Sequence, residues 1–147
     1  MRPQSSPDGA PSGVAAYMPS NGFAASYVAE AASIPRARHA VRALAEAGGA
    51  TTAQLDDIAL ASSEAITNVV RHAYIGTVGE IHVRARVTSR RLCIVVTDDG
   101  VGLTHIPANP GLGLGLGLDV MREVSDEMSL EDRPGGGVEV RMRFGVG

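Results

Sequence analysis

An apolar stripe with the period of a helix, followed by two segments with the period of a strand, constrains the fold of this chain more than any other feature. Small and apolar residues recur every three or four positions between about residues 52 and 74, which predicts a long amphipathic helix. Residues 81–87 then alternate apolar and polar side chains, as in a half-buried strand, and residues 92–97 form a second strand after a short turn. The closeness of these two strands predicts a hairpin.

Weaker patterns predict the remaining elements. They are a strand at 25–33, a helix that begins at Pro35 and stops near Gly48, a helix at 118–127, and strands at 128–130 and 138–144 joined by the turn 133–137. Ser33 is the candidate cap of the helix that begins at Pro35. Because helices and strands segregate along the chain, the predicted fold class is α+β. It is a two-layer sandwich in which the helices cover one face of an antiparallel or mixed sheet.

The length of 147 residues is that of one ordinary domain. Residues 1–22 contain four prolines among Ser, Gly and Ala, so they are predicted to be a flexible N-terminal tail. Residues 23–147 are predicted to form the folded domain, with no second domain and no internal repeat.

Composition excludes several functions. All 13 basic residues are Arg, and the absence of Lys excludes a Walker-type phosphate loop and Schiff-base chemistry. The net charge of -3 gives no reason to expect a nucleic-acid partner. Cys93 lies in an apolar run and is predicted to be a buried structural thiol. No apolar stretch of about 18 residues and no signal peptide are present, so a cytoplasmic protein without membrane association is expected.

Glu64 and Asn68 are the first pair with chemical potential. They lie four positions apart on the long predicted helix, so their side chains share one face, on which His72 also lies. A carboxylate can accept the proton of an attacking hydroxyl, and an amide oxygen suits Mg²⁺. Taken alone, such a pair is usually no more than a solvated helix face.

Asp98, Gly100 and Gly102 form the second segment, at the end of a predicted strand. An aspartate there can accept a hydrogen bond from an exocyclic amine such as that of adenine. The glycines allow the backbone to pass close to a ring or a ribose. Taken alone, an acidic turn after a strand explains these residues equally well.

Gly111, Gly113, Gly115 and Gly117 alternate with leucines in the third segment. Glycines are poor strand formers, so the segment is predicted to be a glycine-rich loop that enters a helix. The free N–H groups and the dipole at such a helix start favour a phosphate. A flexible linker is the alternative.

In order and spacing, the three segments resemble the GHKL ATP-binding superfamily and, more closely, the bacterial anti-sigma factor serine/threonine kinases. The resemblance covers about residues 26–144. The first box lies at residues 60–74, the second at 96–103 and the third at 113–118. The combination of boxes is specific, whereas any single box is not.

The resemblance implies a GHKL ATPase/kinase fold, ATP and Mg²⁺ as cofactors, and a role for each site residue. Glu64 would be the general base toward a protein serine hydroxyl, Asn68 would hold the Mg²⁺ that bridges the ATP phosphates, and Asp98 would accept from the adenine amino group. The glycines would admit the adenine end at Gly100 and Gly102, and would offer backbone N–H groups to the phosphates at Gly113, Gly115 and Gly117.

The resemblance also implies a biological role. The chain would sequester a sigma factor and phosphorylate a serine of a STAS-type anti-anti-sigma antagonist, as in the regulation of transcription during stress responses. Members of this group are often dimers, so a homodimer is among the expectations. No direct nucleic-acid partner and no membrane partner are expected.

The segment at residues 104–111 departs from the family pattern. Kinases of this group can place an arginine in or near this lid to meet the γ-phosphate, but here the lid contains neither Arg nor Lys, and His105 is its single candidate cation. An ATP-binding partner-switching module without kinase activity therefore remains an alternative. A detached ATP-binding domain of a histidine kinase is a weaker one.

Overall fold

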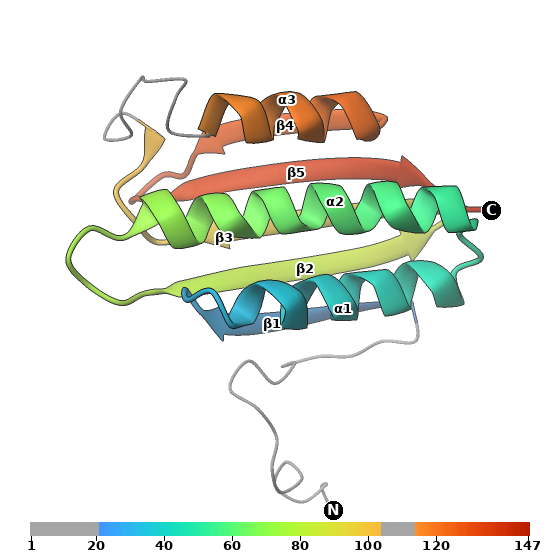
Figure 1. Ribbon diagram of the computed structural model, residues 1–147, viewed down its shortest axis with the longest axis horizontal. Helices are drawn as coiled ribbons and strands as arrows, with labels where there is room; N and C mark the ends of the chain where they lie inside the picture. Colours follow the sequence, from blue (N-terminus) through green and yellow to red (C-terminus); the bar gives the residue numbers. More distant parts are fainter. Residues whose placement is uncertain (1–20, 104–113) are drawn as a thin grey trace, which may run out of the picture.

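The computed structural model describes residues 21–103 and 114–147, which form one five-stranded sheet and a layer of three helices (Figure 1). In chain order the elements are β1 (Gly22–Val28), α1 (Ser33–Ala47), α2 (Thr52–Asn68), the π-helix η1 (Val69–Ala73), β2 (Glu80–Thr88), β3 (Arg91–Asp98), α3 (Leu114–Val124), β4 (Glu127–Asp132) and β5 (Val138–Gly145). The strand order is β1-β2-β3-β5-β4, and every neighbouring pair is antiparallel. The predicted two-layer α+β fold is confirmed.

The helices lie on one face of the sheet, and the core lies between the two layers (Figure 1). Alternation along β2 buries every second side chain of residues 81–85 under the helices, as the period of two predicted, whereas β3 buries three successive residues, Ile94, Val95 and Val96. The core is aliphatic, with Ile58, Ile66, Ile81, Leu92 and Ile94 among its largest fully buried side chains. The opposite face of the sheet carries the polar and charged residues of the same strands.

The long helix predicted from the apolar stripe is confirmed in extent, but it changes character near its end. Its start is closed by a capping box, in which the Thr51 hydroxyl accepts from the Gln54 N–H and the Gln54 side chain accepts from the Thr51 N–H. After Asn68 the helix widens into η1. Such π turns are rare and occur frequently at functional sites.

Three boundary predictions were wrong. The first strand spans Gly22–Val28 rather than 25–33, because Phe23 and Tyr27 are the side chains that fit the core. Ser33 is not a cap; it lies inside α1, where it is almost completely buried. α3 begins at Leu114 rather than 118 and ends before β4, so Gly115 and Gly117 belong to the helix and not to a loop before it.

Cys93 is half-buried rather than fully buried, because its position in β3 points to the sheet face that the helices leave uncovered. Its sulfur lies 4.0 Å from the Arg141 guanidinium. Of the predicted tail, residues 1–20 lie outside the described residues, as do Gly113 and the lid. Within the described parts of the chain, no helix has both the length and the apolar character that crossing a membrane requires.

Candidate functional site

A hollow between the end of α2, the end of β3 and strands β4 and β5 brings together residues from the first two sequence segments. It contains about 410 Å³ of space outside the protein atoms, part of which is open to solvent. Asn68, His72 and Asp98 are the polar side chains that line it, and Gly102 lines it with its backbone. The remaining walls are apolar, formed by Ala65, Val69, Ala73, Val96, Leu103, Leu130, Val138 and Val140. Apolar walls with a few convergent polar groups are typical of a small-molecule site.

The third segment reaches the first through α3. A side-chain carbon at Gly117 would lie 2.9 Å from Glu64 Oε1 and 3.5 Å from Asn68 Oδ1, so the helix backbone packs directly against this pair. Gly115 and Gly117 lie in the first turn of α3, whose N–H groups have no partner within the helix. The structure therefore brings Glu64 and Asn68 together with the start of α3. Gly113, the first glycine predicted for this segment of the site, lies outside the described residues.

Asp98 lies at the bottom of the hollow with its side chain almost completely buried. Its Oδ1 accepts a hydrogen bond of 2.8 Å from the Gly100 N–H. Burial raises the pKa of the Asp98 carboxyl above the usual 3.8, although hydrogen bonds from the Gly100 and Val138 backbone act in the opposite direction. A buried carboxyl in a largely apolar pocket is a group that a ligand donor can satisfy.

The fold itself requires glycine at positions 100 and 102. A side-chain carbon at Gly100 would overlap the carbonyl of Ala73 at the end of η1, and the Val101 N–H donates to that same carbonyl at 2.8 Å. Gly102 has φ +84, which glycine adopts without strain. The loop after β3 is therefore pressed against the π turn, and both glycines are needed to build the hollow even before a ligand is considered.

His72 places a buried polar group in the hollow. Its Nε2 is buried and makes no hydrogen bond among the described residues, although the side chain lines the hollow. Burial lowers the pKa of His72 below 6.5, and the nearby Arg71 lowers it further. A neutral imidazole can donate from Nε2 to a ligand oxygen, which would remove the cost of an unpaired buried nitrogen.

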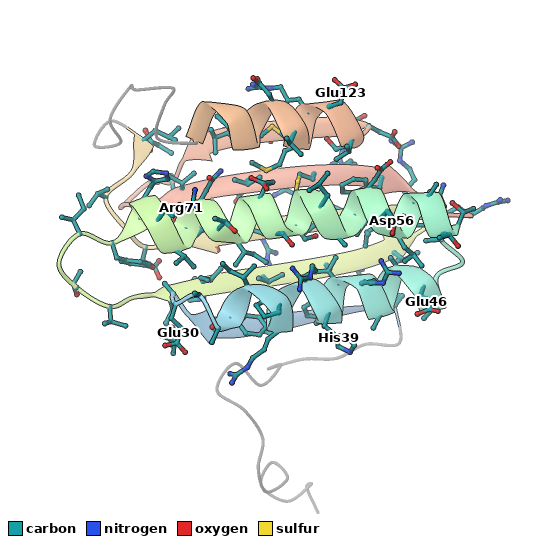
Figure 2. The ribbon with its side chains drawn as sticks, in the orientation of Figure 1. Glu30, His39, Glu46, Asp56, Arg71 and Glu123 are labelled. Atoms are coloured by element: carbon teal, nitrogen blue, oxygen red, sulfur yellow. The ribbon has the colours of Figure 1, made fainter. Side chains whose placement is uncertain are left out.

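Arg71 was missed by the sequence analysis. Figure 2 labels it at the C-terminal end of the α2–η1 rod, and it is exposed in η1 three positions after Asn68. Residues three and four apart share a helix face, so this spacing was the available signal. Arg71 is thus an exposed cation in η1, three positions after Asn68, and it lies outside the lid.

Tyr74 and Arg133 were also missed. The Tyr74 hydroxyl accepts from the Asp99 N–H at 2.9 Å and donates to the Glu80 carbonyl at 2.6 Å. Arg133, in the turn between β4 and β5, donates to the Asp98 carbonyl oxygen. No local pattern in the sequence indicates either contact, because the partners are distant along the chain.

The donor set fits a nucleotide with Mg²⁺ rather than a metal ion held by protein alone. No three His, Cys, Asp or Glu side chains of residues 21–103 and 114–147 are grouped so that they could hold a metal ion. A Mg²⁺ at Asn68 would therefore take its other ligands from phosphate oxygens and water, as Mg²⁺ commonly does. Phosphate oxygens could meet the unpaired His72 Nε2 and the Asn68 side chain, against which Gly117 packs. A base could meet the buried Asp98 carboxyl.

Comparison with known proteins shows to which family the chain belongs. The histidine kinase-like ATPase domain family matches residues 27–144. An anti-sigma F factor of Caldanaerobacter subterraneus subsp. tengcongensis is 35% identical over 120 residues, which is 76% of this chain and 84% of that protein. Anti-sigma F factors of Thermoanaerobacter sp. (strain X514), at 34% over 76% of this chain and 84% of the relative, and Clostridium acetobutylicum, at 31% over 73% and 81%, are similar. The chain belongs to the histidine kinase-like ATPase domain family.

Proposed function

We propose that this chain is an anti-sigma factor that binds ATP with Mg²⁺ and phosphorylates a serine of a partner protein. The observation that carries the proposal is the convergence of three distant segments: Asn68 and Asp98 line one hollow, and Gly117 packs against Glu64 and Asn68. The similarity to proteins named anti-sigma F factor supports a sigma factor as the sequestered partner.

We assign the base of ATP to the apolar part of the hollow. Asp98, at its bottom, would accept a hydrogen bond from the 6-amino group of adenine, which would satisfy a carboxyl that burial otherwise penalises. The aliphatic walls would contact the faces of the ring. Adenine is thus selected by one polar contact in a largely apolar pocket.

We assign the phosphates to the side of Asn68 that faces the start of α3. Asn68 would hold Mg²⁺, and the free N–H groups at the start of α3 and the Nε2 of His72 would donate to phosphate oxygens. Arg71 supplies positive charge that the lid lacks. Mg²⁺, when bound, supplies neutralisation of charge on the phosphates.

Glu64 is the residue to which we assign proton transfer. Its carboxylate lies beside the first turn of α3 and one helical turn from Asn68. It would take the proton of the attacking serine hydroxyl as that oxygen bonds to the γ-phosphorus, while the bond from this phosphorus to the bridging oxygen breaks and ADP leaves. Positioning and charge neutralisation dominate phosphoryl transfer, and the residues around Glu64 provide both.

The partners belong to the same proposal. The substrate would be a serine on a STAS-type anti-anti-sigma protein, and a homodimer would be the assembled form. The second candidate function is ATP-dependent partner switching without phosphorylation, which the arginine-free lid favours. In that case nucleotide binding alone would control which partner is held.

Phosphotransfer to a candidate antagonist domain tests the proposal. The purified chain with Mg-ATP is expected to produce phosphoserine, detected by mass spectrometry. Glu64→Gln keeps the shape that packs against Gly117 and should abolish transfer while retaining ATP binding. Glu46→Gln, on the exposed face of α1, is the matched control and should transfer normally (Figure 2). Equal transfer by Glu64→Gln would exclude the base assignment, and ATP-dependent partner capture without phosphoserine would favour the second function.

A further inference from the structure

Arg133 holds the end of β3, where Asp98 lies, through two hydrogen bonds. Arg133 Nη1 donates to the backbone carbonyl oxygen of Asp98 at 2.6 Å and to Asp99 Oδ1 at 2.9 Å. One guanidinium therefore fixes two successive residues at the end of β3. The fold brings it there, since β5 pairs with β3 and the turn before β5 consequently lies beside the end of β3.

Arg133 is one end of a chain of contacts that crosses three strands. The other oxygen of Asp99, Oδ2, lies 2.8 Å from His82 Nε2 on β2. The Nδ1 of that histidine lies 2.9 Å from the Ser26 hydroxyl on β1. We name these four residues, Ser26, His82, Asp99 and Arg133, the clasp. Both carboxylate oxygens of Asp99 are engaged, so the loop is tied to β2 and to the β4–β5 turn at once.

The turn that presents Arg133 is itself fixed. The Arg133 N–H donates to the Gly137 carbonyl at 2.9 Å, and the Gly136 N–H donates back to the Arg133 carbonyl at 3.0 Å. Gly137 has φ +93, and a side-chain carbon there would overlap the Asp98 carbonyl oxygen. The turn therefore lies directly against the backbone of Asp98 and allows it little freedom.

Clasp and hollow lie on opposite sides of Asp98. Successive side chains in extended backbone point to opposite faces, so Asp98 points into the hollow while Asp99 points to the clasp. A hydrogen bond on the Asp98 carbonyl consequently sets the direction of the Asp98 carboxyl. Loss of the clasp would free the Asp98 backbone, so the carboxyl and the Gly100 N–H bonded to its Oδ1 would shift together without removing any residue from the hollow.

The exposure of the clasp side chains indicates that the clasp fixes the position of Asp98 rather than raising the global stability of the fold. The side chains of Arg133, Asp99 and His82 are 33%, 59% and 32% exposed. Ion pairs at this level of exposure contribute little to the stability of a fold. The hydrogen bond to the Asp98 backbone, by contrast, acts on a residue that is almost completely buried in the site.

We propose that Arg133 is a positioning residue for adenine recognition, holding the Asp98 carboxyl at the angle at which it meets the 6-amino group. This inference rests on the proposed ATP site. It concerns selectivity between purines, so its signature is the ratio of affinities for a purine with a 6-amino group and one without it.

Calorimetry with ATP and with inosine triphosphate, which carries a 6-oxo group, tests the proposal. Arg133→Gln is expected to weaken the binding of ATP about tenfold and that of inosine triphosphate less than about twofold. Only ATP carries the 6-amino group that would donate to the positioned Asp98 carboxyl. Arg133→Lys keeps a cationic donor and should restore part of the ratio. The control is Arg141→Gln, which removes an exposed arginine that pairs with Glu139 at 3.1 Å on the uncovered sheet face and should leave the ratio unchanged.

Each outcome separates the inference from the function on which it rests. Failure of the unmodified chain to bind ATP would refute the proposed function. Normal ATP binding with an unchanged ratio in Arg133→Gln would refute the positioning role. An equal loss of both nucleotides, accompanied by a lower melting temperature and no recovery in Arg133→Lys, would make Arg133 a structural residue only and also overturn the proposal.

Discussion

Gly117→Ala is the substitution that most sharply separates stability from function in this fold. Gly117 lies in the first turn of α3, where glycine is less favourable than alanine by about 0.5–1 kcal/mol. The added carbon would lie 2.9 Å from Glu64 Oε1, whereas ordinary contacts begin at 3.4 Å. The opposing atom is the far end of a flexible side chain, so the carboxylate can retreat by about 0.5 Å at small cost. We therefore expect a free energy of unfolding that is unchanged or about 0.5–1 kcal/mol higher.

The same displacement should damage catalysis. Misplacement of a reacting group by about 1 Å can reduce a rate about 100-fold, so a retreat of about half that distance is expected to slow phosphotransfer about tenfold. Urea unfolding followed by circular dichroism measures the first quantity, and phosphoserine formation under single-turnover conditions measures the second. A double-mutant cycle with Glu64→Ala isolates the steric term, because alanine at position 117 should gain its full helix preference once the carboxylate is absent. A loss of more than about 1 kcal/mol in Gly117→Ala, retained in the Glu64→Ala background, would show that α3 contacts something other than Glu64 and would refute the reasoning.

Three further predictions concern the hollow. Asn68→Ala should abolish the Mg²⁺ dependence of ATP binding measured by calorimetry, and unchanged dependence would exclude Asn68 as the ligand. Asp98→Asn should weaken ATP at least about tenfold while making the nucleotide-free protein no less stable at neutral pH, since burial raises the pKa of Asp98 and the charged form is the penalised one. In urea unfolding, any gain in stability of Asp98→Asn should shrink as the pH falls through this raised pKa, and it should vanish only below 3.8, where the natural carboxyl is neutral in both states; a gain that persists below 3.8 would contradict this explanation. ATP binding near about pH 6 should take up protons, because a phosphate beside Nε2 raises the lowered pKa of His72, and calorimetry in buffers of different ionisation enthalpy should show no such uptake for His72→Ala.

The sequence predicted well those elements whose buried residues recur at a regular period. The stripe from Leu55 to Ala73 and the alternation of residues 81–87 each report one face turned toward the core, and both were confirmed. The first strand was misplaced because its alanines carry little hydrophobic contrast, and only packing of Phe23 and Tyr27 fixes its register. The start of α3 was misplaced because glycine suggests a loop, whereas contact with Glu64 and Asn68 requires glycine inside the helix.

The contacts around the Asp98 loop could not have been predicted from local sequence. Arg133, Tyr74 and His82 reach the loop from three separate elements, and only the pairing of β2 and β5 with β3 brings them together. The turn that contains Arg133 was predicted as a turn, but nothing in its sequence indicates what the arginine contacts. The register of the strand pairing, rather than the local propensity of the residues, decides which side chains meet in this part of the site.

Tight backbone contacts explain why the same glycines appear in both the structural and the functional account. Gly100 is pressed against Ala73, and Gly117 against Glu64 and Asn68, so an added side-chain carbon at either position would meet the neighbouring element. At Gly100 the opposing atoms are backbone, and substitution should disrupt the fold, whereas at Gly117 the nearest atom is a movable carboxylate. Glycine at position 117 is less favourable for the helix than alanine, and under the proposed function it would preserve the position of Glu64. A residue that stabilises the fold less than its simplest replacement is expected where a catalytic geometry has to be kept.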